Sequence, residues 1–232
     1  MNTSIYQIGI PNLLIGFIPA AVVVVIYACW ALKTGTLLYA IVRMVIQLLL
    51  IGLVLNYIFN TDSPILVSIL LTFMLLVASW IALRPIHEHR IKFYFTALVS
   101  IVIGGMFTLA VVVFGVIQLN PWYEPRYLIP LAGMIFSIAM NSVSLAAERF
   151  LSEESKGVPY IEARNTAFKT ALLPNINTLF AVGLVALPGM MTGQILAGIS
   201  PFIAVRYQIM VMFMLLGSAG ISSALYLSLH KK

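Results

Sequence analysis

The residues best suited to chemistry lie between Tyr127 and Gly198, where amide, hydroxyl, glycine and proline residues interrupt apolar sequence. Asn and Ser side chains can hydrogen-bond a solute or a neighbouring helix, and inside a bilayer they must face protein or water. One polar series follows spacings of four, four, three and four residues, which place its members along one side of a helix: Gly133, Ser137, Asn141, Ser144 and Glu148. This polar stripe predicts a helix–helix seam, such as a dimer axis, or the wall of a substrate pathway.

A second polar region begins with Pro174, which is tolerated in the first turn of a helix, beside Asn175 and Asn177. Further along, proline and glycine stand together inside apolar sequence and predict a broken or bent helix. Inside a membrane such a break persists only where protein or a water-filled cavity satisfies the freed backbone groups. We therefore interpret five residues as a gate: Pro188, Gly189, Met190, Met191 and Gly193.

Arg43 is a basic residue inside an apolar stretch, and Gln47 follows it four residues later on the same face of the predicted helix. A long cationic side chain near the end of a span can reach the membrane interface while its stem stays in lipid. Alternatively, the pair forms a cytoplasmic mouth that attracts or positions a ligand. The sequence leaves both interpretations open.

The acidic residues decide which class of transporter fits. Proton-driven and sodium-driven pumps usually keep an ionisable relay within their spans, at a substantial desolvation cost. Here all seven carboxylates lie in predicted loops or at span ends: Asp62, Glu88, Glu124, Glu148, Glu153, Glu154 and Glu162. This placement disfavours a secondary transporter and favours an external source of energy.

Motifs for enzyme and metal chemistry are missing from the sequence, which contains neither H-E-x-x-H nor G-x-S-x-G. His87 and His89 are two residues apart and would point in different directions on a helix, so we read them as part of a solvated loop. Methionines such as Met210 offer thioether ligands to soft metal ions, but methionine is also an ordinary packing residue. We expect no catalytic residue, no metal site and no cofactor in this chain.

The composition identifies the elements that must position these residues. The chain has 232 residues, of which 62% are hydrophobic and 9% are charged, whereas soluble domains carry about 25% charged residues. A spanning helix needs roughly 20 mostly apolar residues. We predict an all-α, polytopic bundle in the cell membrane, a single permease domain over residues 1–232, with about seven spans: 12–32, 37–59, 64–83, 94–117, 127–147, 173–196 and 206–229.

The basic residues predict the orientation of the spans. Cytoplasmic loops carry the excess of Lys and Arg, and the predicted loops divide these residues ten against two. Only Arg126 and Arg206 fall on the minority side, so we expect the N-terminus outside and the C-terminus in the cytoplasm, with a charged cytoplasmic loop over Leu151–Lys169. The formal charge of +6 then reflects topology and lipid headgroups rather than nucleic acid. The majority side holds Lys33, Arg84, Arg90, Lys92, Arg149, Lys156, Arg164, Lys169, Lys231 and Lys232.

Three runs of sequence carry a resemblance to a known family. LVALPGMMTGQILAGISPFIAVRYQIMVMFML at 184–215, ALLPNIN before it and GMIFSIAMNSVSLAAERF further upstream resemble the FetB/YbbM-like family of ABC transporter permeases. Residues 43–48 also match an R-x-x-x-Q-L pattern, so the resemblance covers most of the chain. The chain departs from the family at Ser137-Ile138, where many relatives have Gly-Asn, and in a shorter segment before ALLP.

The resemblance implies a polytopic permease that pairs with a separate ATP-hydrolysing subunit, and we expect the permease to work as a homodimer. Bacterial relatives are associated with iron export and plant relatives with aluminium tolerance. This chain lacks the G-x-x-x-x-G-K-[ST] motif, so ATP would bind on the partner. The alternative is a non-transporting scaffold or regulator that recruits an ATPase to the membrane.

We also hypothesise roles for particular residues of such a permease. A loop at about 148–172 would contain a short coupling helix seated on the ATPase, with Glu148, Arg149, Glu153, Gly157, Glu162 and Arg164 at the contact. The substrate pathway would be lined by Arg43, Gln47, Asn141, Ser144, Asn175, Asn177 and Gln208.

Overall fold

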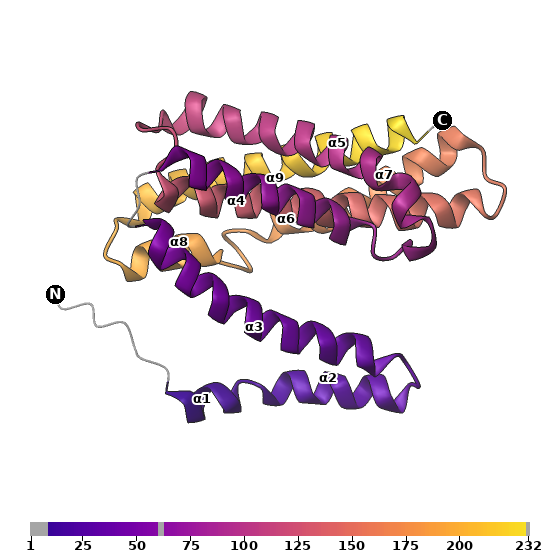
Figure 1. Ribbon diagram of the computed structural model, residues 1–232, viewed down its shortest axis with the longest axis horizontal. Helices are drawn as coiled ribbons and strands as arrows, with labels where there is room; N and C mark the ends of the chain where they lie inside the picture. Colours follow the sequence, from indigo (N-terminus) through magenta and orange to yellow (C-terminus); the bar gives the residue numbers. More distant parts are fainter. Residues whose placement is uncertain (1–8, 60–62, 231–232) are drawn as a thin grey trace. The chain divides into compact units, whose positions relative to one another are not determined.

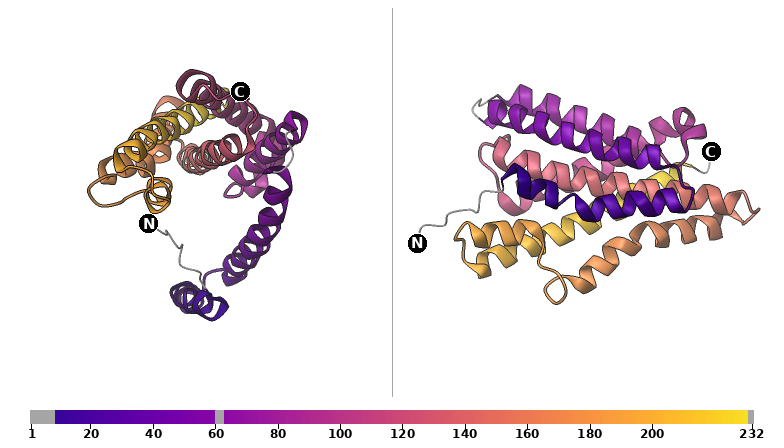
Figure 2. Two further views of the ribbon diagram at one scale, coloured as in Figure 1. Left: turned by 90° about the vertical axis from the view of Figure 1, so that its left-hand side faces the viewer. Right: turned by 90° about the horizontal axis from the view of Figure 1, so that it is seen from below.

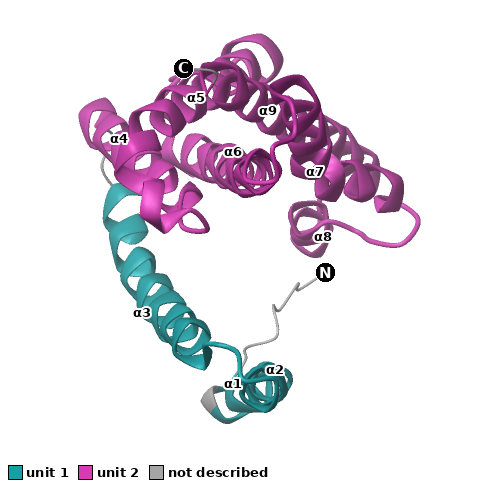
Figure 3. Cartoon of the chain, turned by 90° about the vertical axis from the view of Figure 1, so that its right-hand side faces the viewer, with its two compact units in different colours: residues 1–61 teal, residues 62–232 magenta. Residues whose placement is uncertain are grey.

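The computed structural model describes residues 9–59 and 63–230 (Figure 1). In this part of the chain the regular elements are helices, and the one isolated bridge joins Val182 and Ala186. The predicted all-α class is therefore confirmed. The packing divides the chain into unit 1, residues 1–61, and unit 2, residues 62–232 (Figure 3). The single permease domain stays a prediction.

The described part of unit 1, residues 9–59, contains three helices: α1 (Ile10–Ile15), α2 (Ile18–Cys29) and α3 (Thr34–Phe59). α2 and α3 pack against each other across a tight turn, in which Ala31 has a left-handed φ of 54° and the Leu32 amide donates to the Tyr27 carbonyl at 2.9 Å. Among the described side chains of this unit only Ile58 is buried. Apolar helices with exposed side chains are what a lipid environment favours.

Unit 2 is a helical bundle built around one long central helix. α6 packs against α4, α5, α7 and α9, and the views along the bundle show it in the middle (Figures 2 and 3). The elements are α4 (Pro64–Ala82), the short 3-10 helix η1 (His87–His89), α5 (Arg90–Ala110), the π-helical segment η2 (Val111–Ile117), α6 (Pro125–Glu154), α7 (Tyr160–Ala181), α8 (Gly189–Leu196) and α9 (Pro201–Leu229).

Proline residues mark the start of three of the long helices, α4, α6 and α9. Pro64, Pro125 and Pro201 occupy the first positions of α4, α6 and α9. Proline suits this position because its fixed φ is helical and its missing N–H would have no partner there. At α4 the Ser63 hydroxyl adds a cap by accepting from the Leu66 amide at 3.5 Å.

Small residues allow α5 and α9 to touch backbone to backbone. A Cβ atom on Gly104 would lie 2.3 Å from the Ser222 hydroxyl oxygen and 2.8 Å from the Ser222 backbone nitrogen. About one turn of helix before Ser222 in α9, the Ser218 hydroxyl donates to the Ile135 carbonyl of α6 at 3.1 Å. Close approach of small residues and hydrogen bonds between helices are the main sources of association in lipid, where no hydrophobic effect separates helix from tail.

Six helical segments in the described residues are long and apolar enough to span a membrane, one fewer than the predicted seven. They are Pro11–Cys29, Thr34–Phe59, Pro64–Ala82, His87–Ile117, Pro125–Glu154 and Pro201–Leu229. The predicted span at 173–196 is instead the end of α7, an irregular segment at 182–188 and α8. Gly183, with a left-handed φ of 84°, and Pro188, directly before α8, interrupt the helix.

The expected charged loop over Leu151–Lys169 is wrong. α6 continues to Glu154 and α7 begins at Tyr160, so the chain reverses within residues 155–159. The expected short coupling helix is the first part of a longer helix, and Pro174, expected in a first turn, lies inside α7. The physical reason is that Ala, Glu, Arg and Lys are good helix formers, and a charged helix is stable where it projects into water.

Candidate functional site

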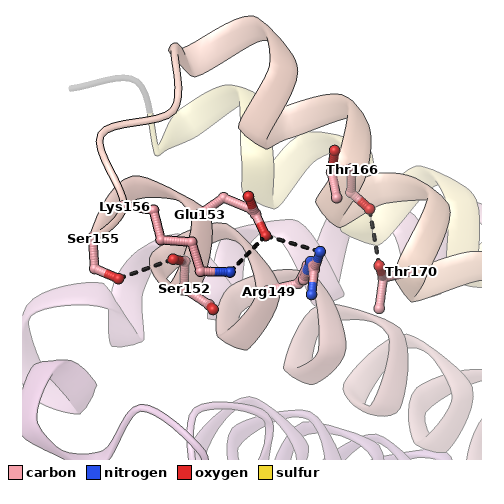
Figure 4. Close-up of polar contacts among 7 residues, drawn as sticks. All are labelled: Arg149, Ser152, Glu153, Ser155, Lys156, Thr166 and Thr170. Atoms are coloured by element: carbon pink, nitrogen blue, oxygen red, sulfur yellow. Dashed lines mark hydrogen bonds and ion pairs between the residues drawn. The ribbon is translucent and has the colours of Figure 1, made fainter.

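The reversal between α6 and α7 gathers charge into a compact structure, which we call the charged elbow (residues 148–164). The Glu153 carboxylate is buried and pairs with the Arg149 guanidinium at 2.8 Å and the Lys156 ammonium at 3.3 Å (Figure 4). Ser155 donates to the Ser152 carbonyl at 2.9 Å. Gly157, with a φ of 78°, takes the left-handed conformation that lets the chain turn back.

Three of the six residues predicted to contact the ATPase are exposed, and the other three interact with neighbouring residues of the chain. Glu148, Gly157 and Glu162 are exposed, so a partner protein can reach them. Arg149 and Glu153 are engaged with each other inside the elbow. The Arg164 guanidinium lies 5.9 Å from the Tyr160 ring centre and donates to the Asn165 side chain at 3.2 Å. Direct contact of any of the six with an ATPase stays a prediction.

Basic residues concentrate at the end of unit 2 that carries the elbow. Among the described residues of unit 2, Arg126 and Arg206 lie at the other end, where α6 and α9 begin. We call the two ends the elbow end and the α8 end, because α8 lies far from the elbow (Figure 1). The remaining seven basic residues are Arg84, Arg90, Lys92, Arg149, Lys156, Arg164 and Lys169.

The polar stripe of α6 lies on the side of the helix that unit 2 leaves open. Ser137, Asn141 and Glu148 are exposed, and Gly133 and Ser144 are partly exposed. The opposite side of α6 is buried among the other helices, through residues that include Ala132, Ile135, Ala139, Val143 and Ala146. The stripe therefore does not form a seam within unit 2, and an outer seam and a pathway wall both stay predictions.

Of the predicted pathway residues on α7, the structure connects one to α6. The Asn175 amide donates to the Ser142 hydroxyl at 3.3 Å, whereas Asn177 is exposed. Ser142 is buried and was missed by sequence reasoning, because it lies beside the stripe rather than within it. Within the described residues no hydrogen bond joins two members of the predicted pathway.

Arg43 and Gln47 lie one turn apart on α3 of unit 1, where Arg43 is partly exposed and Gln47 is exposed. The helical spacing on which their pairing depends is confirmed, since α3 is continuous over both residues. Snorkelling and a ligand-attracting mouth both stay predictions.

The predicted helix break is confirmed, and it covers the seven residues 182–188 rather than only the Pro188–Gly189 pair. After α7 ends, the segment 182–188 turns back through Gly183, whose amide donates to the Ala186 carbonyl at 3.0 Å. Pro188 then leads into α8, where the Thr192 hydroxyl donates to the Pro188 carbonyl at 3.1 Å. The predicted gate residues Gly189, Met190, Met191 and Gly193 all belong to the first turns of α8. Their role as a gate stays a prediction.

Gln208 on α9 is the most unusual of the predicted pathway residues. Its side chain is 5% exposed, and neither its amide nitrogen nor its amide oxygen has a hydrogen-bond partner in the described residues. The amide oxygen of Gln194 on α8 is also buried without a partner. A buried polar group without a partner costs about 1–3 kcal/mol, so such groups call for a specific reason. Gln208 offers a donor and an acceptor to a solute or to water inside the bundle.

An aromatic cluster at the elbow end was missed by sequence reasoning. The His230 ring lies 4.1 Å from the Phe93 ring, 4.9 Å from the Phe150 ring and 5.5 Å from the Tyr226 ring, measured between ring centres. The Tyr160 hydroxyl donates to the Leu227 carbonyl at 2.9 Å. The four-residue spacing of Tyr226 and His230 is visible in the sequence, but Phe93 and Phe150 come from distant helices.

Burial lowers the pKa of His230 below its ordinary value, because the charged imidazolium is poorly solvated in this cluster. The Glu154 carboxylate acts in the opposite direction, while Lys92 and His89 lower the pKa further. His230 is therefore held in its neutral form at the base of the elbow.

No group of three or more His, Cys, Asp or Glu residues in the described ranges is arranged to hold a metal ion. Cys29 is a free, exposed thiol in unit 1, and His87 and His89 are exposed in η1.

Comparisons with known proteins agree with this architecture. The model of the Uncharacterised protein family UPF0014 matches residues 10–165 and 157–232. The chain is 37% identical to UPF0014 membrane protein slr1647 of Synechocystis sp. over 79% of the chain and 76% of the relative. It is 35% identical to the Probable iron export permease protein FetB of Escherichia coli, over 84% of the chain and 80% of that protein.

The relatives extend to plants. The chain is 35% identical to UPF0014 membrane protein STAR2 of rice, Oryza sativa subsp. japonica, over 82% of the chain and 71% of the relative. No solved structure matches the chain significantly. The six apolar spans and these matches show a multi-pass membrane protein, as predicted. The chain belongs to the UPF0014 family of membrane proteins.

Proposed function

We propose that this chain is the membrane-spanning permease subunit of an ABC transporter that exports iron, or a solute linked to a metal, with ATP hydrolysed by a separate subunit. The observation that carries this proposal is the 35% identity, over 84% of the chain, to a relative whose name describes a probable iron export permease. The chain has no G-x-x-x-x-G-K-[ST] motif of its own, which supports a separate site for the nucleotide.

The elbow supports an ATPase contact at one end of unit 2. Among the described residues of unit 2, seven basic residues lie at that end and two at the other, and under the positive-inside rule this distribution favours a cytoplasmic elbow. The first turns of α7 form a rigid helix whose exposed residues, including Glu162, can enter a groove on a partner. Closure of two ATPase subunits would push on this helix.

The open polar side of α6 supports a homodimer with a central pathway. In lipid a polar stripe must be covered by protein or water, and unit 2 leaves Ser137 and Asn141 exposed. A second copy across this stripe would satisfy the requirement and enclose a polar path. Movement at the segment 182–188 would then open or close the path, which requires two alternative arrangements of that segment.

The metal-binding side chains that the chain offers indicate whether iron would travel free or as a complex. Ferric ion prefers hard oxygen ligands, and the described residues offer no cluster of carboxylates. Gln208, with both amide atoms unpaired, can hydrogen-bond a neutral or anionic group. We therefore propose that the metal travels as a complex with a small organic ligand.

Transport by the reconstituted complex tests the proposal. Proteoliposomes that contain this chain and its ATPase should move radioactive iron citrate only when ATP is supplied on the side of the ATPase. The matched control replaces the lysine of the ATPase G-x-x-x-x-G-K-[ST] motif by alanine and should abolish movement. A complex that hydrolyses ATP yet moves neither free nor chelated iron would contradict the proposal and favour a scaffold.

A further inference from the structure

A long apolar groove runs along the outside of unit 2 between two helices. It has a volume of about 430 Å³ and lies between α9 on one side and α5 with η2 on the other. On α9 its lining residues recur at helical spacing from Arg206 through Met210 and Phe213 to Gly217 and Ile221. At about 1.5 Å per residue, this stretch covers about 22 Å of helix, enough to cross one leaflet of a hydrocarbon core about 30 Å thick.

The groove is apolar along its length and basic at one end. Its α5 and η2 wall consists of Phe107, Thr108, Val111, Val112 and Val116, and its cationic member is Arg206 at the α8 end. Gly217 keeps the floor open, because a Cβ atom there would find only the Thr108 hydroxyl, at 3.9 Å.

Two smaller cavities adjoin the basic end of the groove. One of about 220 Å³ is lined by Arg206, and one of about 340 Å³ is lined by Arg126. They share Ile117, Tyr207 and Met210, so both guanidinium groups border adjacent hollows. Tyrosines at this level match the aromatic belt at a membrane interface.

The two arginines form no ion pair with the described residues of the protein. Both are exposed, and within residues 9–59 and 63–230 neither forms an ion pair or a side-chain hydrogen bond. Arg126 also lies in the first turn of α6, where the helix dipole adds further positive potential. A planar guanidinium binds phosphate through two parallel hydrogen bonds, so this place suits a phosphate group.

We propose that the groove holds an anionic phospholipid of the leaflet at the α8 end, with its phosphate at Arg206 and Arg126 and one acyl chain along α9. This inference goes beyond transport and does not depend on it. A second copy of the chain is a poorer occupant. A two-fold axis along the membrane normal would bring the Arg206 residues of both copies together at one depth, and like charges repel.

Lipid retention by the full-length chain tests this proposal. The protein would be purified in an uncharged detergent from mixed micelles with equal amounts of dioleoyl phosphatidylglycerol and dioleoyl phosphatidylcholine, and the retained lipids would be counted by mass spectrometry. The natural chain should retain an excess of phosphatidylglycerol. Arg206→Gln should reduce this excess about fivefold, the effect of one basic residue at an anionic surface. Arg206→Lys should keep most of it.

The contribution of the groove and the contribution of the arginine charge are each tested with a matched control variant. Gly217→Leu should fill the groove and lower the retention of both lipids, whereas Gly220→Leu, on the same helix in open space and outside the lining, should not. Arg84→Gln removes an exposed arginine at the elbow end and should leave retention unchanged. Melting temperatures would confirm that each variant is folded, and if Gly217→Leu fails to fold, the surface variant Arg206→Gln decides.

Two results would overturn the proposal. One is an Arg206→Gln protein that retains as much phosphatidylglycerol as the natural chain. The other is a Gly217→Cys variant, made in a Cys29→Ser background, that forms disulfide-linked dimers in membranes, since the groove would then be covered by a second copy.

Discussion

At Gly104 the identity of one residue fixes the distance between two helices. A methyl group there would press on the backbone of Ser222 as well as on its hydroxyl, so a change of side-chain rotamer would not relieve the clash and the helices themselves would have to move apart. Interiors are close-packed and resist such movement. The position therefore favours glycine over any larger residue.

We predict that Gly104→Ala destabilises the protein by about 1–3 kcal/mol, the usual cost of overpacking. Unfolding in detergent, followed by circular dichroism, would measure the change. Gly220→Ala is the control, because its Cβ atom meets no atom within 4 Å, and it should be neutral or stabilising by about 0.5–1 kcal/mol. Equal behaviour of both variants would disprove the close contact.

The neutral His230 predicts a dependence of stability on pH. Its pKa is lowered in the folded state, so between that value and the ordinary value of 6.5 the unfolded chain binds the extra proton. Stability should therefore be complete above about pH 6.5 and fall as the pH drops through the folded-state pKa of His230.

The measurement compares melting temperatures at about pH 7.5 and about pH 5. The natural chain and the control His87→Gln, which changes an exposed histidine, should lose several degrees more than His230→Phe, which keeps an aromatic ring but cannot be protonated. The cluster has no such role if His230→Phe is as acid-sensitive as the natural chain.

At this scale the sequence identified several unusual polar residues but not their partners. Gln208 and Asn175 stood out because amides are rare in apolar sequence. Ser142, which binds Asn175, and Phe93, which packs on His230, could not be predicted. Such contacts join residues from different helices, and a single sequence read on its own does not reveal which helix faces meet.

At the scale of elements, the helix ends at the elbow carry the coupling hypothesis. We predict that Glu162→Trp weakens co-purification of the ATPase subunit at least severalfold, since a bulky apolar residue replaces an exposed charge in the first turn of α7. Ser200→Trp places the same side chain on an exposed position at the α8 end and should have no effect. An ATPase that co-purifies equally with both variants would place the contact elsewhere.

The apolar helices could be predicted from the sequence, whereas the charged helical segments could not. Long apolar runs predicted α3, α4 and α9 well, because a bilayer sets both their length and their composition. The charges of residues 151–169 were read as a loop, although Glu, Ala, Lys and Arg also favour helices that project into water. The Pro188–Gly189 break was predicted, but the additional turn at Gly183 was not, because a single glycine in apolar sequence is common.

At the scale of the molecule, the distribution of charge predicts which end faces the cytoplasm. In a Cys29→Ser background, Ser200→Cys should react with a membrane-impermeant maleimide added to intact cells, because it is exposed at the α8 end. Ser155→Cys, exposed at the elbow, should react only after the membrane is permeabilised. The reverse pattern would disprove the predicted orientation and the cytoplasmic contact of the elbow together.

The contact between α5 and α9 also has a mechanical consequence. Two helices in close contact through Gly104 and the backbone of Ser222 should move together, because sliding or rotation of either helix would produce a steric clash. The irregular segments 155–159 and 182–188 flank α7 at both ends, and a Cβ atom on Gly157 or Gly183 in these segments would meet no atom within 4 Å. Bending of the bundle should therefore concentrate in the segments 155–159 and 182–188, and α7 between them should move as one piece.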